Sequence, residues 1–186
     1  MVVSSRRERT HERLIECALS LFETQGFETT TTAEIAAAAG VTDMTFFRHF
    51  PSKELVVTTD AYDPAIADGV AAQPRGSPPL VRAVRGVGQA LHAMSEPETD
   101  LVRRRVRVIA GSSALRAGTV RSNEATETRI RDQLVEDGAP ALEARVAAAA
   151  LMAALTAALL EWAQDDRASL RAAIESALHT LEGSHA

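Results

Sequence analysis

The chain has few cysteines and few aromatic residues, and both scarcities limit the fold classes that it can adopt. It contains one cysteine in 186 residues, Cys17, so no disulfide can form within it, and a reducing compartment is expected. Aromatic residues make up only 4% of the sequence, and strand-like runs of Val, Ile and Thr are scarce. Alanine and leucine, which favour helix, are abundant instead. These features predict an all-α chain of about nine helices, with ample hydrophobic residues for a core.

Signals for secretion or membrane insertion are also missing. The N-terminal stretch MVVSSRRERTHERL is charged where a signal peptide needs an apolar segment. The longest uncharged apolar run lies between Arg145 and Glu161, and its fifteen residues are too few to cross a bilayer. We therefore expect a cytoplasmic protein without a membrane partner.

No pattern indicates catalysis or metal binding. The chain lacks a glycine-rich phosphate loop and a serine nucleophile elbow. Asp165 and Asp166 stand at an expected helix start, where carboxylates complement the helix dipole. The histidines do not have the spacing of metal ligands; they are His11, His49, His92, His179 and His185. The sequence predicts no enzyme, no metal and no cofactor.

The overall charge argues against a nucleic-acid partner. The formal net charge is −5, and residues 1–55 carry six basic and eight acidic side chains. Because phosphate contacts dominate DNA affinity, DNA binding would need a local basic footprint. The clustered basic groups are Arg6, Arg7, Arg9, Arg48, His49 and Lys53. A second run, from Arg103 to Arg107, is dense enough to wrap a helix, and it is either a basic patch or a set of solvated and acid-paired side chains.

Two short helices are predicted around a tight turn. Thr31 and Glu34 have capping-box spacing, and Gly40 stands where the helix end needs a left-handed residue. Thr42 can cap the next helix, which runs to about His49. Two short helices joined in this way are the pattern of a helix-turn-helix.

The core of this segment follows from periodicity. A helix over residues 7–24 repeats apolar side chains on one face. The large apolar residues that would pack against it are Ile35, Val41, Phe46, Phe50 and Leu55. Phe47 lies about 100° around the helix from Phe46, so a buried Phe46 leaves Phe47 partly exposed for sugar or thymine-methyl contact.

The other faces of the third helix carry groups that can touch phosphates and base edges in a major groove. These residues are Thr42, Asp43, Thr45, Phe47, Arg48 and His49. Arg6 and Arg9 would add contacts if the N-terminal stretch acts as an arm, although a solvated tail is an equal alternative. A three-helix unit without a DNA role is the weaker reading.

The string TTTTAEIAAAAGVTDMTFFRHFPSKEL, preceded by ALSLFETQGFETT, resembles the TetR family of bacterial repressors over about residues 10–57. TFFRHFPSKE looks like an actinobacterial subgroup. The resemblance implies a helix-turn-helix DNA-binding domain at residues 1–52 and a ligand-binding and dimerisation domain at residues 53–186, whose first helix is the connector. It also implies DNA contacts by Thr32, Thr42, Thr45, Phe47, His49 and Lys53. The family commonly has Tyr at the position of Phe47, so the contact there would be apolar only.

The rest of the chain reads as helices. Pro64 predicts a kink or break near residues 60–64. Further helices are expected from Ser77 to about Met94, across Leu101 to Ile109, from Ser112 or Ser113 to Gly138, from Pro140 to about Gln164, and from about Arg167 to Leu181.

The last two helices predict a homodimer. The helix after Pro140 is apolar or small all round, so one face can pack inside the subunit and another against a partner. Residues assigned to that interface are Val146, Ala153, Leu160, Leu170, Ile174 and Leu178. A small-molecule pocket is implied by the resemblance, and its assigned residues are Met94, His92, Asn123, Met152, Thr156 and Trp162.

These expectations combine into a repressor that binds a palindromic DNA operator as a homodimer and is released by a small, largely apolar effector. The alternative is a protein-interaction or ligand-binding module that keeps the helix-turn-helix as a scaffold. The acidic N-terminal region supports that alternative.

Overall fold

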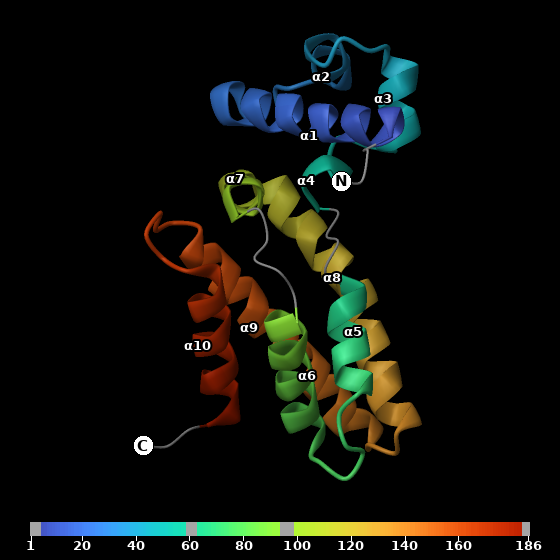
Figure 1. The fold of residues 1–186 in the computed structure, drawn as a ribbon, viewed down its shortest axis with the longest axis vertical. Coiled ribbons are helices and arrows are strands. Elements are labelled where there is room, and N and C mark those ends of the chain that lie inside the picture. Colours follow the sequence, from blue (N-terminus) through green and yellow to red (C-terminus); the bar gives the residue numbers. More distant parts are fainter. Residues whose placement is uncertain (1–4, 59–62, 94–98, 184–186) are drawn as a thin grey trace. The chain divides into compact units, whose positions relative to one another are not determined.

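The computed structural model describes residues 5–58, 63–93 and 99–183, and every regular element within these ranges is a helix (Figure 1). This confirms the all-α prediction. The ten helices of the described ranges are α1 (Arg6–Gln25), α2 (Thr32–Ala38), α3 (Asp43–His49), α4 (Leu55–Thr58), α5 (Asp63–Ala71), α6 (Pro79–Ala93), α7 (Thr99–Gly111), α8 (Ser113–Glu136), α9 (Ala141–Trp162) and α10 (Leu170–Glu182).

The count is close to the predicted nine, and the kink or break predicted near residues 60–64 lies mostly outside the described residues. α4 ends at Thr58, and α5 begins at Asp63 with Pro64 in its first turn. Proline fits a first turn because its missing amide hydrogen has no partner there in any helix.

The chain divides into two compact units. The N-terminal unit comprises residues 1–59 and 104–119, and the C-terminal unit comprises residues 60–103 and 120–186. The N-terminal unit therefore takes in α4, the second part of α7 and the start of α8, which a boundary at residue 52 does not anticipate. The sequence does not show this because the added segment is remote along the chain.

In the C-terminal unit, small and branched apolar side chains of α5, α6, α8, α9 and α10 form the core. The buried members are Val70, Ala83, Val84, Val87, Ile130, Leu134, Ala144, Ala147, Ala148, Leu151, Met152, Leu155 and Leu178. α9 supplies six of them from its alanine-rich sequence. Alanine permits the helix axes to approach closely, which is what this sequence bias achieves.

Two glycines allow α5 and α6 to cross at backbone contact. A β-carbon on Gly86 would lie 2.5 Å from the Val70 amide nitrogen, and one on Gly69 would lie 2.3 Å from the Gly86 carbonyl oxygen. Any side chain at either position would force the helices apart.

A buried ion pair joins α6 to the end of α8. The Arg82 guanidinium donates from Nη2 to Asp137 Oδ2 at 2.5 Å, and both side chains are almost fully buried. The Arg82 hydrogen bond, then that of Gln133, holds the pKa of the Asp137 carboxyl below its ordinary value. Arg75 adds a second contact to Asp137 at 2.9 Å from an exposed position.

α9 is longer than the fifteen-residue run suggested. By length and composition alone, it is the one helix of the described residues that could cross a membrane. The sequence argument was too strict, because it ended the segment at Arg145 and Glu161 although the helix continues past both. The buried face of α9 lies in the C-terminal core, and core helices of water-soluble proteins meet the same criterion.

Candidate nucleic-acid interface

The start of α1 places three arginines on a helix. Ser5 caps it: the Ser5 hydroxyl accepts from the Glu8 amide at 3.2 Å, and the Ser5 amide donates to the Glu8 carboxylate at 2.6 Å. Arg6 and Arg9 are exposed in the first turns. The capping box stabilises helix from Arg6 onward, so these arginines belong to α1 rather than to a solvated tail, and their contact with DNA stays a prediction. Their charges are presented from a rigid element.

The helix-turn-helix forms as its capping residues predict. Thr31 and Glu34 make a reciprocal capping box at α2, and Thr42 caps α3 through the Thr45 amide. Gly40 has φ +63°, a left-handed conformation that glycine adopts without steric cost. The hydrogen bonds of Thr31 hold the pKa of the Glu34 carboxyl below its ordinary value.

α3 buries one face and exposes another. Phe46 is fully buried, whereas Phe47 is 50% exposed and meets the Phe46 ring edge-on with centroids 5.5 Å apart. Met44, one turn before Phe47, is 76% exposed. The sequence analysis missed Met44, although its offset from Phe46 and its spacing to Phe47 were a usable signal. Met44 and Phe47 lie one turn apart and form a small exposed apolar patch, and such patches can mark a contact surface.

The core differs from the prediction at two positions. Ile35, Phe46 and Phe50 are buried as expected. Leu55, however, is 37% exposed, and Val41 is only partly buried. The buried positions of α4 are the next two residues, Val56 and Val57. An apolar run of three does not reveal which members face inward, because the direction of α4 is a tertiary property.

The polar members of the predicted reading surface differ in exposure. Asp43 and Arg48 are exposed, whereas Thr32 and Thr45 are partly buried. The Thr42 and Thr45 hydroxyls lie 3.1 Å apart. Each hydroxyl keeps further donor or acceptor capacity for an outside partner.

His49 lies beside a second histidine from α1. The rings of His11 and His49 have centroids 5.7 Å apart, and His11 also stacks on Phe50 at 4.5 Å. Burial, and then the neighbouring His49, lowers the pKa of His11; burial, and then Arg7, lowers the pKa of His49. Both rings therefore favour the neutral form, so the basic footprint at neutral pH consists of arginines.

Lys53 is engaged within the protein. Its Nζ donates to the carbonyl oxygens of Phe27 at 2.7 Å and Thr30 at 2.8 Å, with that of Glu28 at 3.4 Å. The same ammonium lies 4.4 Å from the Phe27 ring centroid. An ammonium has three donors, so these carbonyls already provide its full set of partners. The structure favours a structural role over the phosphate contact that the sequence suggested.

Acidic side chains of α1 are neutralised by Arg104. Its guanidinium binds Glu23 through two hydrogen bonds of 2.7 and 2.8 Å and Glu16 through one of 2.6 Å. The Glu28 carboxylate accepts from the Ser112 hydroxyl at 2.6 Å, which is the main reason that the pKa of Glu28 is lowered. Of the two readings of the arginine run, the paired one holds for Arg104. The negative charge of residues 1–55 is thus partly compensated inside the N-terminal unit.

Two models of known protein families match this chain. The family described as bacterial regulatory proteins, tetR family, matches residues 14–57, and the family described as MftR C-terminal domain matches residues 78–186, more than half of the chain. The chain belongs to the TetR family. The TetR-type match covers α2, α3 and the second part of α1, whose burial is described above.

Two relatives share part of the sequence. The HTH-type transcriptional regulator TcmR of Streptomyces glaucescens is 45% identical over 85 residues, which cover 45% of this chain and 37% of TcmR. MftR of Mycobacterium tuberculosis, which is named as a mycofactocin biosynthesis transcriptional regulator, is 30% identical over 120 residues. These cover 62% of this chain and 59% of MftR. The chain thus spans less than two thirds of either relative.

The fold resembles solved structures over nearly its full length. The crystal structure of native NalD, the secondary repressor of the MexAB-OprM multidrug efflux pump in Pseudomonas aeruginosa, has a TM-score of 0.64 at 21% identity, with 96% of each chain covered. At this identity the likeness concerns the fold alone.

In the TetR-family C-terminal unit, the predicted pocket residues do not form one group. Met94 lies outside the described residues. His92 is 69% exposed, with Nδ1 2.7 Å from the Gly88 carbonyl oxygen and Nε2 3.8 Å from Glu175. His92 thus lies on an exposed face of α6, and its assignment to the ligand pocket stays a prediction.

Two other predicted pocket residues, Asn123 and Thr156, do come together, and Thr156 also bonds the main chain of a third. The Asn123 amide donates to the Thr156 hydroxyl at 3.2 Å, and the Thr156 hydroxyl donates to the Met152 carbonyl at 2.8 Å. Trp162 is a separate case: it is buried at the end of α9, and its indole donates to the Ala168 carbonyl at 3.0 Å.

The predicted dimer residues divide between two faces. Leu170 and Leu178 are buried within the C-terminal unit, and Ile174 packs against its core. The apolar face of α10 is thus largely used by its own subunit, which leaves little of Leu170 and Leu178 for a partner, whereas the partly buried Ile174 stays a predicted interface residue. On α9, by contrast, Val146 is 57% exposed, Ala153 is exposed and Leu160 is partly exposed.

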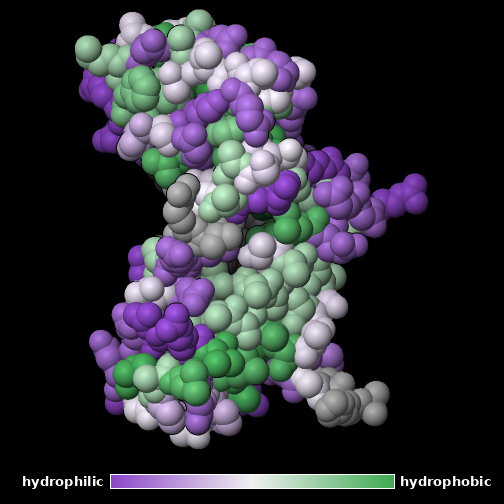
Figure 2. Space-filling view, turned by 180° about the vertical axis from the view of Figure 1, so that it is seen from behind, coloured by the Kyte–Doolittle hydropathy of each residue, from purple (hydrophilic) through white to green (hydrophobic). Residues whose placement is uncertain are grey.

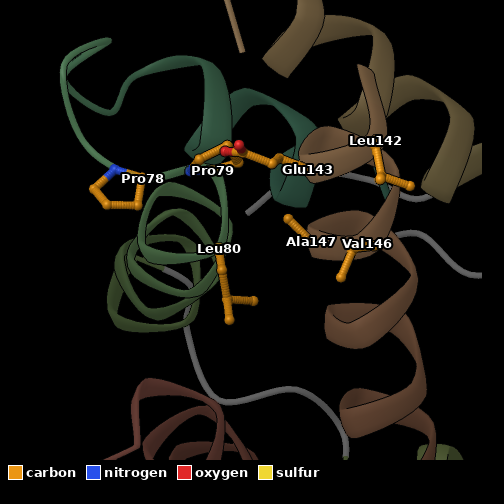
Figure 3. A pocket seen from close by; sticks show the side chains of 7 residues that line it. All are labelled: Pro78, Pro79, Leu80, Leu142, Glu143, Val146 and Ala147. Carbon is orange, nitrogen blue, oxygen red and sulfur yellow. The ribbon is translucent and has the colours of Figure 1, made fainter. Parts of the chain in front are cut away.

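An apolar stripe runs along the outer face of α9. It consists of Leu142, Val146, Ala149, Ala150, Ala153, Ala157 and Leu160. Figure 2 shows a green, hydrophobic band on the lower part of the visible face. At the start of α9, a groove of about 370 Å³ lies between the stripe and the first turn of α6, with Pro79, Leu80 and Val146 among its lining residues (Figure 3).

Proposed function

We propose that this chain is a DNA-binding transcriptional repressor that binds a palindromic operator as a homodimer and is released by a small, largely apolar effector. The observation that carries the proposal is α3, which is fixed by buried Phe46 and presents exposed Met44, Phe47 and Arg48. A short, well-capped helix with this exposure suits insertion into a major groove. Membership of the TetR family supports the same conclusion.

The proposed base contacts are apolar and polar. Met44 and Phe47 can contact thymine methyl groups, and Thr45 and His49 can donate or accept at base edges. Arg48, together with Arg6 and Arg9 on α1, supplies the phosphate contacts, and Thr32, Thr42 and Asp43 border the surface. Lys53 acts indirectly by holding the backbone that leads into α2.

Dimerisation makes up for the sparse charge of one subunit. A twofold-symmetric dimer doubles the arginine contacts and places two α3 helices on half-sites about one DNA turn apart, ~34–36 Å or a multiple of it. We assign the interface to the α9 stripe, because this long apolar face is exposed in the subunit. The groove beside Val146 extends the same surface.

The effector site is proposed within the C-terminal unit. The Asn123 amide and the Thr156 hydroxyl form a polar pair, and Met152 lies one turn before Thr156 on α9 as a flexible apolar residue, a combination that suits a small, largely apolar molecule. An effector releases DNA only if it binds the two conformations with different affinity. We propose no enzymatic activity and a cytoplasmic location.

The alternative, an interaction module without DNA binding, rested on the acidic N-terminal region. Arg104 pairs with two of those acids, so this observation now favours the alternative less.

A titration with labelled genomic fragments at low and moderate salt tests the proposal. Fragments that stay bound at moderate salt are selected, and we expect them to share a palindrome. Arg48→Ala should weaken binding to all fragments and lower the salt slope by about 2, because each subunit of the dimer loses one phosphate contact. Arg129→Ala, which removes an exposed arginine from α8, is the matched control.

Two outcomes would contradict the proposal. Absence of binding to any fragment at low salt would remove the DNA-binding function. An unchanged salt slope in Arg48→Ala would remove Arg48 from the contacts.

A further inference from the structure

Two apolar side chains project from the exposed face of α3. Met44 is 76% exposed and Phe47 is 50% exposed. Three residues separate them, so they share one face and lie about 4.5 Å apart along the helix axis. The Phe47 ring stands edge-on against the fully buried Phe46 ring, at an interplanar angle of 89°. Phe47 is thus a supported ring, whereas the unbranched Met44 side chain can adapt its shape.

The polar groups of the same surface are partly engaged within the chain. The Thr42 hydroxyl accepts from the Thr45 amide at 3.3 Å and lies 3.1 Å from the Thr45 hydroxyl. His49 is partly buried, with its ring 5.7 Å from that of His11. Asp43 is exposed, but its carboxylate only accepts hydrogen bonds and is repelled by phosphate. Apolar contact is therefore the interaction that this face of α3 offers most directly.

The charges around the apolar pair suit a DNA duplex. Arg48 follows Phe47 and is exposed, and the exposed Arg6 and Arg9 belong to the same compact unit. Guanidinium groups bind phosphate oxygens. Two side chains are too few for a stable protein interface, which buries about 800 Å² on each partner. A duplex is the partner whose chemistry and size match this surface.

The major groove of DNA offers one apolar group that distinguishes the bases. That group is the C5-methyl of thymine, since the other distinguishing groups are hydrogen-bond donors or acceptors. Cytosine lacks this methyl group unless it is 5-methylcytosine. The spacing of about 4.5 Å between Met44 and Phe47 along α3 is close to the ~3.4 Å step between successive base pairs. The two side chains can therefore meet methyl groups on two neighbouring base pairs.

We propose that Met44 and Phe47 select the operator through C5-methyl groups, so that each half-site needs thymine, or another 5-methylpyrimidine, at two neighbouring base pairs. This proposal rests on the proposed function and adds to it the group of atoms that is recognised. Burial of one methyl group strengthens binding about fourfold. The loss of one contact from both half-sites of a palindrome should then weaken binding about 15-fold.

Uracil tests the proposal because it lacks the methyl group of thymine and keeps every hydrogen-bonding group. A synthetic, fluorescently labelled duplex copies one of the selected palindromic fragments. Each thymine of the half-site is replaced in turn by uracil, together with its symmetry mate. We expect two neighbouring positions at which the dissociation constant of the wild-type protein, measured by anisotropy, rises about 15-fold. Uracil at the other positions should leave the constant unchanged.

Two variants assign the methyl groups to side chains. In Met44→Ala and in Phe47→Ala, uracil should have no further effect at the position that the deleted side chain contacted, and its full effect at the other position. Val135→Ala shortens an exposed apolar residue of α8 and is the matched control, which should retain both effects. Circular dichroism verifies that all three variants fold.

A second duplex places the methyl group on a different base. At one of the two sensitive positions, the T·A pair of each half-site is replaced by C·G, with either cytosine or 5-methylcytosine. We expect the methylated duplex to bind the wild-type protein about 15-fold more tightly than the unmethylated one. Equal affinity for the two duplexes would attribute the discrimination to base hydrogen bonds and would contradict methyl recognition.

Other outcomes separate this proposal from the proposed function. Methyl recognition is overturned, while DNA binding stands, if uracil at every thymine leaves the wild-type affinity unchanged. Selected half-sites without thymine would overturn it as well, and so would full uracil effects at both positions in Met44→Ala and Phe47→Ala alike. Absence of binding to any fragment at low salt would instead refute the DNA-binding function, and methyl recognition with it.

Discussion

Lys53 places one ammonium group against the carbonyls that close the connection from α1 to α2. Carbonyl groups in a turn lack helix partners, so a cation that collects them stabilises the turn. The Phe27 ring adds a cation–π contact on the same side. Lys53 therefore helps to fix the position from which α2 and α3 start.

The first prediction concerns this residue. Lys53→Met keeps the apolar stem and removes the charge, and we expect it to lower the free energy of unfolding by about 1.5–3 kcal/mol, the range for hydrogen bonds to charged groups. Urea denaturation measures this value. The salt slope of DNA binding should stay near the wild-type slope. A variant with unchanged stability and a reduced salt slope would contradict the structural role and support a phosphate contact by Lys53.

The second prediction concerns His11 and His49. Both have a pKa below 6.5 in the folded protein, so the unfolded chain takes up protons first as the pH falls. The stability that the neutral rings contribute is complete above 6.5 and is lost as the pH falls from there toward the folded pKa values. Urea midpoints measured from about pH 8 to pH 5 should fall, and His11→Asn should flatten that decline. His179→Asn, on an exposed position of α10, should follow the wild type.

At the scale of elements, the α5–α6 crossing depends on two missing side chains. Gly86→Ala places a methyl group against the Val70 backbone, and we expect a loss of about 1–3 kcal/mol of stability from overpacking. Gly88→Ala on the same helix is the matched control, since its nearest neighbour is Leu178 Cδ1 at 4.0 Å. The control should be neutral or gain about 0.5–1 kcal/mol in helix propensity. Equal melting temperatures for both variants would disprove the close crossing.

α3 shows which features the helical repeat predicts correctly. Capping by Thr42, burial of Phe46 and exposure of Phe47 all follow from residue type and the helical repeat, and all three are confirmed. Leu55 and Leu178 show where this reasoning ends. Apolar spacing identifies the apolar face of a helix. It does not say whether that face packs against the same subunit, packs against a partner subunit or stays partly exposed to solvent.

At the scale of the whole molecule, the α9 stripe predicts the oligomeric state. Val146→Glu places a charge in the centre of an apolar contact, so we expect the variant to sediment as a monomer at micromolar concentration while the wild type sediments as a dimer. Val135→Glu changes another exposed valine, on α8, and should remain dimeric. A monomeric wild type would exclude the proposed interface.

The sequence alone determined the helical class, the capped helix-turn-helix and the family, because these are recorded in patterns of residues close along the chain. Tertiary structure decided which partner each polar group found. Lys53 met carbonyls more than twenty residues away, and Arg104 met acids of α1 more than eighty residues away. A charged side chain pairs with whatever the fold brings within a few ångströms, and no local pattern records that.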